Sequence, residues 1–141
     1  MSIEANKDVV RRYQEAYNRS DLEALDALVD PHLVTHSLMP GLPPGLEGGK
    51  RAHQMTVASF PDLHYHIDEL VAEGETVVER FTITGTQQGD FMGLPPTGRP
   101  TRFAGVSFFR LKAGKIVEHW GLQDGLTLMV QLGVFTPPGS G

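Results

Sequence analysis

The sequence predicts an α+β domain in which helices pack on one face of an antiparallel sheet. Up to Pro61, apolar residues recur at helical spacing, and after Pro61 the period of the pattern changes to two. Short turns separate the period-two segments, which is typical of strands joined by hairpins. Because strands twist, we expect a curved sheet that forms a cone with an apolar interior when three helices cover its concave side. The 141 residues fit a single domain over 1–141.

The N-terminal half predicts three helices. The first has an apolar stripe and ends at Asn18-Arg19-Ser20; its stripe consists of Val9, Val10, Tyr13, Ala16 and Tyr17. Ser20 and Glu23 have the spacing of a capping box for a second helix, which Pro31 ends. A short extended piece over 33–36 and a Pro/Gly loop from Met39 to Gly45 follow. The third helix spans 48–60.

The C-terminal half predicts four strands, over 63–71, 76–86, 101–111 and 115–124. Tight turns at Glu73-Gly74-Glu75 and Ala113-Gly114 form hairpins, and a second Pro/Gly loop covers 92–98. A short apolar helix over 126–132 and a flexible tail over 136–141 complete the chain. With edge strands included, we expect a mostly antiparallel sheet of four to six strands.

Composition excludes several functional classes. The 12 basic and 17 acidic residues give a net charge of -5 with no basic stripe, which argues against a nucleic-acid partner. No cysteine is present, so disulfides, thiolate metal sites and a cysteine nucleophile are excluded. No apolar run approaches the roughly 18 residues of a membrane span, and no signal peptide is visible. We therefore expect a cytoplasmic protein without membrane contact.

Asp124 is the first candidate catalytic residue. It ends a strand whose other members include Ile116, Trp120 and Leu122, and an apolar environment raises the pKa of a carboxyl group. Such a group suits proton removal from carbon. The alternative is an N-cap for the following helix, since Asp is a favoured cap. Trp120, four residues earlier, shares its strand face and either walls a pocket or packs in the core. His119 has the opposite parity, and only a β-bulge would bring it to Asp124.

Further candidates have two interpretations each. His36 follows a short strand beside a loop and is either a pocket group or an exposed histidine. Arg80 lies within a strand and either binds a substrate oxygen or pairs with a cross-strand acid. His53, in the third helix, is a further binding candidate. His64, His66 and Asp68 share one strand face, which we interpret as a polar outer face rather than a metal site.

Several segments resemble the SnoaL-like polyketide cyclases of the NTF2-like superfamily, over roughly residues 6–133. They are YNRSDLEAL at 17–25, FPDL at 60–63, GTQQGDFMGLPPTGR at 85–99 and GKIVEHW at 114–120, together with Asp124. The resemblance implies a cone-shaped α+β barrel and ring closure by intramolecular aldol condensation without metal or organic cofactor. It implies an acid/base role for Asp124. His36, Arg80 and the His119-Trp120 pair match residues that are frequent in the family. The sequence departs from the family at Gln87, where many relatives carry histidine.

We therefore expect a cofactor-independent enzyme that encloses a small apolar polyketide-like or terpenoid-like molecule. The residues expected to surround the substrate include Tyr17, Phe81, Phe91, Phe103, Phe108 and Trp120. The alternatives are an isomerase that uses Tyr13 or Tyr17 as a donor, an epoxide hydrolase that uses Asp124 and Arg80, and a domain that binds a ligand without reaction. The resemblance also implies a homodimer that pairs through the convex face of the sheet.

Overall fold

The computed structural model describes residues 2–37 and 40–139. Met39, at the start of the first predicted loop, and residues 140–141 of the predicted tail lie outside this part of the chain. The elements are α1 (Ile3–Asn18), the 3-10 helix η1 (Leu22–Ala27), β1 (Val29–Thr35), α2 (Gly45–Ser59), β2 (His64–Glu73), β3 (Thr76–Thr86), β4 (Pro100–Lys112), β5 (Lys115–Gln123) and α3 (Gly125–Gln131).

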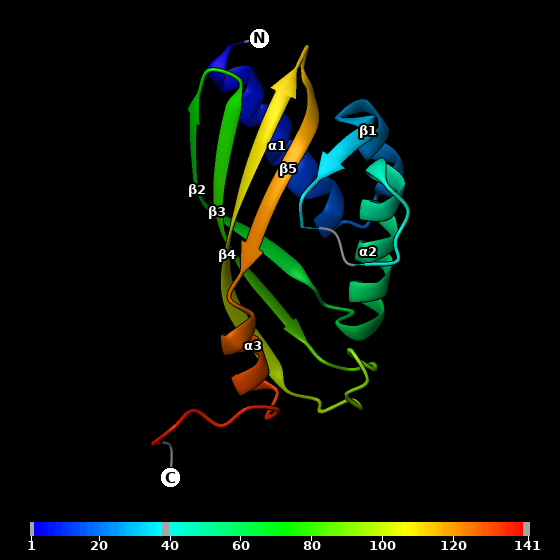
Figure 1. The fold of residues 1–141 in the computed structure, drawn as a ribbon, viewed down its shortest axis with the longest axis vertical. Helices are drawn as coiled ribbons and strands as arrows, with labels where there is room; N and C mark the ends of the chain where they lie inside the picture. Colours follow the sequence, from blue (N-terminus) through cyan, green and yellow to red (C-terminus); the bar gives the residue numbers. More distant parts are fainter. Residues whose placement is uncertain (1, 38–39, 140–141) are drawn as a thin grey trace.

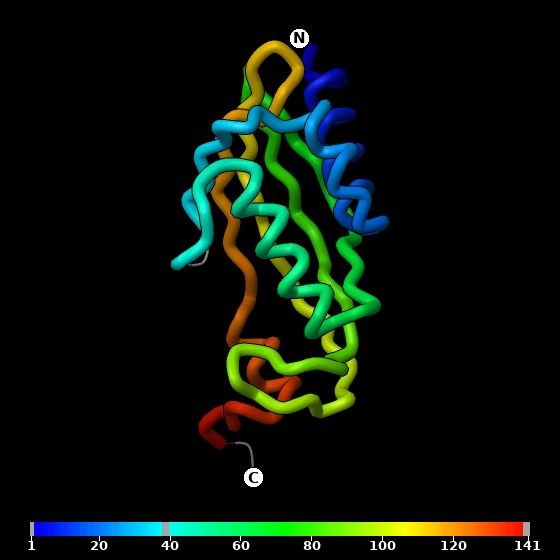
Figure 2. Tube along the Cα trace, turned by 90° about the vertical axis from the view of Figure 1, so that its right-hand side faces the viewer, coloured from blue at the N-terminus to red at the C-terminus, as the bar shows by residue number. Residues whose placement is uncertain are grey.

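The predicted α+β architecture is confirmed, but the sheet is open rather than closed into a barrel. Its five strands have the order β1-β5-β4-β3-β2. β2 to β5 form an antiparallel meander, and β1 pairs with β5 in parallel. α1 and α2 cover one face of the curved sheet, and α3 lies beyond the end of β5 (Figures 1 and 2). In both views the N- and C-terminal ends of the chain lie at opposite ends of the molecule.

The second predicted helix is shorter than expected and begins one residue later. Asp21, not Ser20, is the N-cap of the six-residue η1, and its side chain accepts a hydrogen bond from Ala24. Ser20 adopts a left-handed conformation with φ of 53° and contacts His53 through its hydroxyl. Pro31 lies inside β1 rather than at a helix end, because the chain extends from Val29 to pair with β5.

The strand pattern is confirmed, and β3 and β4 alternate strictly between buried and exposed positions. Their inward side chains divide into two apolar clusters. One cluster contains Val77 and Phe109 and packs beneath α1, whereas the other contains Phe81 and Phe103 and packs toward α3. The inward positions between these clusters are polar, namely Glu79 in β3 and Ser107 in β4.

A β-bulge decides which face each side chain of β5 occupies. Leu111 pairs with Ile116 while Arg110 pairs with Glu118, so that Val117 is an extra residue. One inserted residue reverses the parity of everything that follows. Before the bulge, Ile116 faces inward and is buried in the core. After the bulge, the odd-numbered residues face inward. The first of them is His119, which pairs with the inward-facing Phe109.

Candidate active site

A cavity of about 530 Å³ lies between the concave face of the sheet and helices α1 and α2. Its wall is mostly aromatic and aliphatic, and the loop after β3 and helix α3 contribute to one end. The aromatic residues that line it are Tyr13, Tyr17, Phe60, Tyr65, Phe81, Phe91, Phe103 and Phe109. Such a space has the size and character of a site for a small organic molecule.

A row of polar side chains crosses the cavity floor between the two apolar clusters. Glu79 of β3 pairs with Ser107 of β4, and the Ser107 hydroxyl lies 3.1 Å from Nε2 of His119 in β5. Nδ1 of His119 lies 3.2 Å from the Thr35 hydroxyl in β1. These four residues, which we call the polar row, come from four neighbouring strands and all line the cavity.

Burial shifts the two titratable members of the polar row toward their neutral forms. It lowers the pKa of His119 from 6.5 to about 4, with a smaller contribution from His36. Burial also raises the pKa of Glu79 from 4.5 to about 8. At neutral pH the cavity therefore contains a neutral imidazole and a protonated carboxyl group, the combination from which acid/base pairs are built.

Gln14 and three tyrosines add further polar groups to the wall. Oriented nitrogen-first, the Gln14 amide donates to the two Glu79 oxygens at 3.0 and 3.2 Å. Burial raises the pKa of Tyr13, of Tyr17 and, to about 12, of Tyr65, so all three are neutral donors. Tyr17 also packs against His53, with ring centroids 4.8 Å apart.

The structure brings part of the predicted site together around this cavity. Lining residues include five of the predicted catalytic or binding residues and the aromatic Phe81; the five are Tyr17, His53, Phe91, Phe103 and His119. The Nε2 atom of His53 lies 3.1 Å from the Ser20 hydroxyl, and burial lowers the pKa of this imidazole. These residues, which come from α1, α2, the central strands and the following loop, thus line one cavity, and their part in substrate binding stays a prediction.

Asp124 lies outside the cavity wall, although its neighbours Gln123 and Gly125 belong to it. It is the N-cap of α3, and its carboxylate accepts hydrogen bonds from the Thr127 amide and hydroxyl. These bonds hold the pKa of Asp124 below 3.8 at an exposed position. The predicted rise in its pKa is therefore wrong, because the β5 bulge turns this end of the strand outward, and the alternative N-cap role is confirmed.

Trp120 and His36 also lie on the outer face, which corrects the expectation that Trp120 walls the pocket. Their rings stack with centroids 4.7 Å apart, and the Arg110 guanidinium lies 5.3 Å from the Trp120 ring. Glu118 bridges His36 at 2.8 Å and Arg110 at 3.0 Å. Phe108 pairs with Trp120 on this face and is 46% exposed, so it does not enclose the cavity either.

Arg80 faces outward too, and its alternative interpretation is the correct one. It forms ion pairs with the cross-strand acids Glu69 and Asp68 at 3.4 and 3.9 Å. Asp68 also lies 3.7 Å from His66, so this face of β2 is polar as predicted. Within residues 2–37 and 40–139, no group of three His, Cys, Asp or Glu side chains could hold a metal ion.

Comparison with known proteins identifies the family. The sequence model of the SnoaL-like polyketide cyclases matches residues 7–132. The aklanonic acid methyl ester cyclase DnrD of Streptomyces peucetius is 32% identical over 138 residues, which cover 89% of each chain. The chain belongs to the SnoaL-like polyketide cyclase family.

Solved structures agree with this assignment. TsrD from Streptomyces laurentii has a TM-score of 0.87 at 29% identity, covering 96% of this chain and 99% of that one. IdmH from Streptomyces antibioticus, a candidate polyketide cyclase, has a TM-score of 0.82 at 37% identity, covering 92% and 99%. The fold of this SnoaL-like chain is therefore NTF2-like. Among the described helices, none is long and apolar enough to cross a membrane.

Gln87 has a structural function in this SnoaL-like chain. Its side chain is completely buried, and its amide nitrogen donates to the carbonyl oxygens of Gly89, Leu94 and Pro95. Its carbonyl oxygen accepts from the amide and hydroxyl of Thr97. The residue thus holds together the loop over 88–98, which places Phe91 and Met92 against the cavity.

Sequence reasoning missed three members of the polar row, namely Glu79, Ser107 and Thr35. The signal for Glu79 was present, because it shares the strand parity of the apolar Val77 and Phe81. A charged residue among the apolar, inward-facing positions of a strand is expected to be buried. A buried charged group is a stronger indication of a functional site than an exposed charged group such as Arg80. Thr35 gave no comparable signal, since its approach to His119 depends on the β1–β5 pairing.

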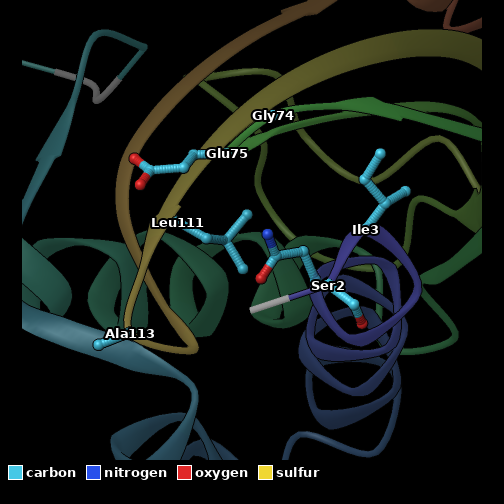
Figure 3. Close-up of a pocket in the computed structure, with 7 residues that line it drawn as sticks. Ser2, Ile3, Gly74, Glu75, Leu111 and Ala113 are labelled. Carbon is cyan, nitrogen blue, oxygen red and sulfur yellow. The ribbon is translucent and has the colours of Figure 1, made fainter.

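A second hollow of about 460 Å³ lies at the far end of the sheet, between the start of α1 and the two hairpin turns (Figure 3). Figure 3 shows Ser2 and Ile3 on the helix side, and Glu75 and Leu111 on the strand side. The buried Oδ1 atom of Asn6 has no hydrogen-bond partner here. This hollow contains none of the predicted site residues and no member of the polar row.

Replacement of Gln87 tests its role in the loop. We expect Gln87→Leu to lower the free energy of unfolding by about 2 kcal/mol, because buried carbonyl groups lose their donor. Urea denaturation measures the change, and hydrogen exchange should accelerate at amides within 88–98. The exposed neighbour provides the matched control, and Gln88→Leu should change stability by about 0.5 kcal/mol or less. Equal effects of the two substitutions would contradict the assigned role.

The pH dependence of stability tests the state of Glu79. Its carboxyl ionises near pH 4.5 in the unfolded chain but near pH 8 in the folded protein, so its contribution to stability falls as the pH rises through this window. His119 has the opposite effect, since its stabilising contribution is lost as the pH falls from 6.5 through about 4. Between pH 6.5 and 8 we therefore expect the free energy of unfolding to decrease with pH.

Glu79→Gln should remove this decrease, because the amide does not titrate. Denaturation at a series of pH values measures it, and the outward-facing Glu69→Gln is the control that should keep the wild-type slope. An unchanged slope in Glu79→Gln would show that another group titrates in this window.

Proposed function

We propose that the protein closes a ring in a small polyketide-like molecule inside the cavity, by acid/base catalysis. The proposal rests on the position of His119. Its imidazole is neutral, lies in an aromatic cavity and has a hydroxyl partner at each ring nitrogen. The family and the name of the relative DnrD support a cyclisation as the reaction. The cavity volume of about 530 Å³ is suited to a small organic substrate.

In the proposed reaction, His119 takes a proton from the carbon next to a carbonyl group of the substrate. Each ring nitrogen has a hydroxyl partner, Thr35 at Nδ1 and Ser107 at Nε2, and we assign the proton to Nε2 because it lies on the side of β4 and the central cavity floor. The resulting enolate carbon attacks a second carbonyl carbon of the same molecule, and a carbon–carbon bond forms. The new alkoxide then takes up a proton, which gives a cyclic alcohol with the same mass as the substrate.

The pKa of about 4 is compatible with a base of this kind. An acidic group of similar pKa removes a proton from carbon in ketosteroid isomerase, where a neighbouring donor stabilises the enolate. The aromatic wall contributes by holding a flexible chain in the folded shape that ring closure requires. Only protons move and one bond forms, so the proposed steps require neither a metal nor an organic cofactor.

The family resemblance supports a different base, Asp124. Its carboxylate is occupied by the cap of α3 and lies outside the wall of the cavity. We therefore assign the proton transfer to His119 and keep Asp124 as the competing assignment. The two assignments make opposite predictions for one pair of variants.

We expect His119→Gln to lower kcat for ring closure by about 10²- to 10⁴-fold, the usual contribution of a general base. Asp124→Asn should change kcat by less than about threefold, because Asn is also a good N-cap. Aklanonic acid methyl ester, named by the relative DnrD, is the test substrate, and chromatography with mass spectrometry detects a product of unchanged mass.

The exposed His64→Gln is the matched control and should retain full activity. An inactive Asp124→Asn beside an active His119→Gln would assign the base to Asp124. Binding of the ester without conversion by the wild-type protein would instead favour a domain that only binds ligands.

We further propose a cytoplasmic homodimer that pairs through the outer face of the sheet. Phe108, Val106 and Leu122 lie on this face and are 46%, 39% and 82% exposed. Exposed apolar side chains on neighbouring strands are characteristic of a protein interface. The stacked rings of His36 and Trp120 extend the same surface.

A charge at the centre of this surface tests the dimer. We expect the wild-type protein to sediment as a dimer and Phe108→Glu to sediment as a monomer with unchanged secondary structure, because a carboxylate buried in an apolar interface costs several kcal/mol. Analytical ultracentrifugation at micromolar concentration measures both. A monomeric wild-type protein would refute the proposed dimer.

A further inference from the structure

Glu79 is the buried titratable group to which the proposed cyclisation assigns no task. It lies in the middle of β3, is 1% exposed and lines the cavity. A carboxyl group that is almost completely desolvated normally has a cationic partner or a metal. No ion pair from a described Lys, Arg or His side chain reaches Glu79, so its surroundings do not compensate a negative charge.

The described groups around Glu79 carry no charge that would hold it ionised, and burial favours its protonated form. The Gln14 amide of α1 lies 3.0 and 3.2 Å from its oxygens, and the neighbouring Tyr13 and Tyr65 are neutral at physiological pH. Ser107, the cross-strand partner of Glu79, contacts His119, which is neutral as well. The Gln14 amide nitrogen cannot accept the acidic hydrogen of a protonated Glu79, so this hydrogen can be donated to an oxygen of a molecule bound in the cavity.

We propose that Glu79 is a catalytic hydrogen-bond donor that binds the carbonyl oxygen of the substrate and stabilises the enolate formed from it. This inference rests on the proposed cyclisation and narrows its substrate to an uncharged ketone or ester whose α-carbon reaches His119. The raised pKa of about 8 agrees with a carboxyl that keeps its proton at neutral pH. A protonated carboxyl in an apolar site performs this task in ketosteroid isomerase.

The sheet geometry suits a carbonyl group between the two residues. Glu79 and His119 belong to β3 and β5, which are separated by one strand, and His119 lies two residues along β5 from Gly121, the residue that pairs with Ser107. Strand spacing and rise together put the two backbones on the order of 12 Å apart. Both side chains face the cavity, and the Ser107 hydroxyl contacts His119. A carbonyl oxygen directed at Glu79 thus places its α-carbon toward His119, and the donor binds more strongly as negative charge develops on that oxygen.

The test compares variants that keep or remove the donor. Glu79→Gln retains an N–H donor of nearly the same shape, whereas Glu79→Leu has none. The probe is 4-nitrophenol, whose ionised form presents a negatively charged phenolate oxygen as hydrogen-bond acceptor and has a distinct absorption spectrum. Infrared difference spectroscopy between the wild-type protein and Glu79→Gln at pH 7 detects a protonated carboxyl directly.

We expect the wild-type protein to show the absorption of a protonated carboxyl that Glu79→Gln lacks. Glu79→Leu should bind 4-nitrophenol about ten- to a hundredfold more weakly than the wild-type protein, and Glu79→Gln less than about fivefold more weakly. The outward-facing Glu69→Leu is the control and should bind the probe as the wild-type protein does. Circular dichroism confirms that each variant is folded.

Three outcomes would overturn the inference: absence of the carboxyl band, equal binding of 4-nitrophenol by the wild-type protein and Glu79→Leu, and equal weakening by the Gln and Leu variants. The last outcome would identify Glu79 as an ionised group whose charge is required. Because neither measurement involves turnover, failure of the cyclase assay would leave both results interpretable. Conversely, an active cyclase whose Glu79→Leu variant binds the probe normally would refute the role of Glu79 alone.

Discussion

The extra residue Val117 in β5 is the constraint on which the arrangement of the site depends. Strand side chains alternate between faces, so a single insertion exchanges the inner and outer sets of everything that follows. The bulge leaves Ile116 in the core and still allows His119 to enter the cavity. It also turns Trp120 and Asp124 outward, where one supports an aromatic stack and the other caps α3.

The cavity combines two features that oppose each other energetically. Its aromatic wall excludes water, and this exclusion penalises any charge on the polar row that crosses its floor. Glu79 and His119 respond in opposite senses, since burial raises the pKa of an acid and lowers that of a base. Both groups therefore become neutral, and the protein retains a proton donor and a proton acceptor about two strands apart. Each costs folding stability over part of the pH range, which is a common property of functional sites.

The loop after β3 covers one end of the cavity, and β1 contributes side chains to both faces of the sheet. Gln87 binds three carbonyl groups of the loop that follows β3, so that Phe91 and Met92 cover one end of the cavity. Thr35 and His36 are consecutive in the chain but serve opposite faces of the sheet. Thr35 contacts His119 within the cavity, whereas His36 stacks on Trp120 outside it. The parallel pairing of β1 with β5 thus supports both the site and the outer surface.

Local sequence patterns were sufficient to predict the α+β class, the antiparallel meander with its hairpin turns, and the aromatic character of the interior. These features follow from local periodicity and turn residues, which act over a few neighbouring positions. Tyr17, His53, Phe91 and Phe103, which we predicted as binding residues, line the cavity, and for Tyr17 and Phe103 this position follows from the apolar face of a regular helix or strand. The three-dimensional arrangement was needed to show that the side chains of Asp124, Trp120, His36 and Arg80 lie outside the cavity. It was also needed to show that Glu79 and Thr35 line the same cavity as His119. The register between distant strands, including the bulge at Val117, sets these positions, and register depends on cross-strand pairing that adjacent residues do not encode.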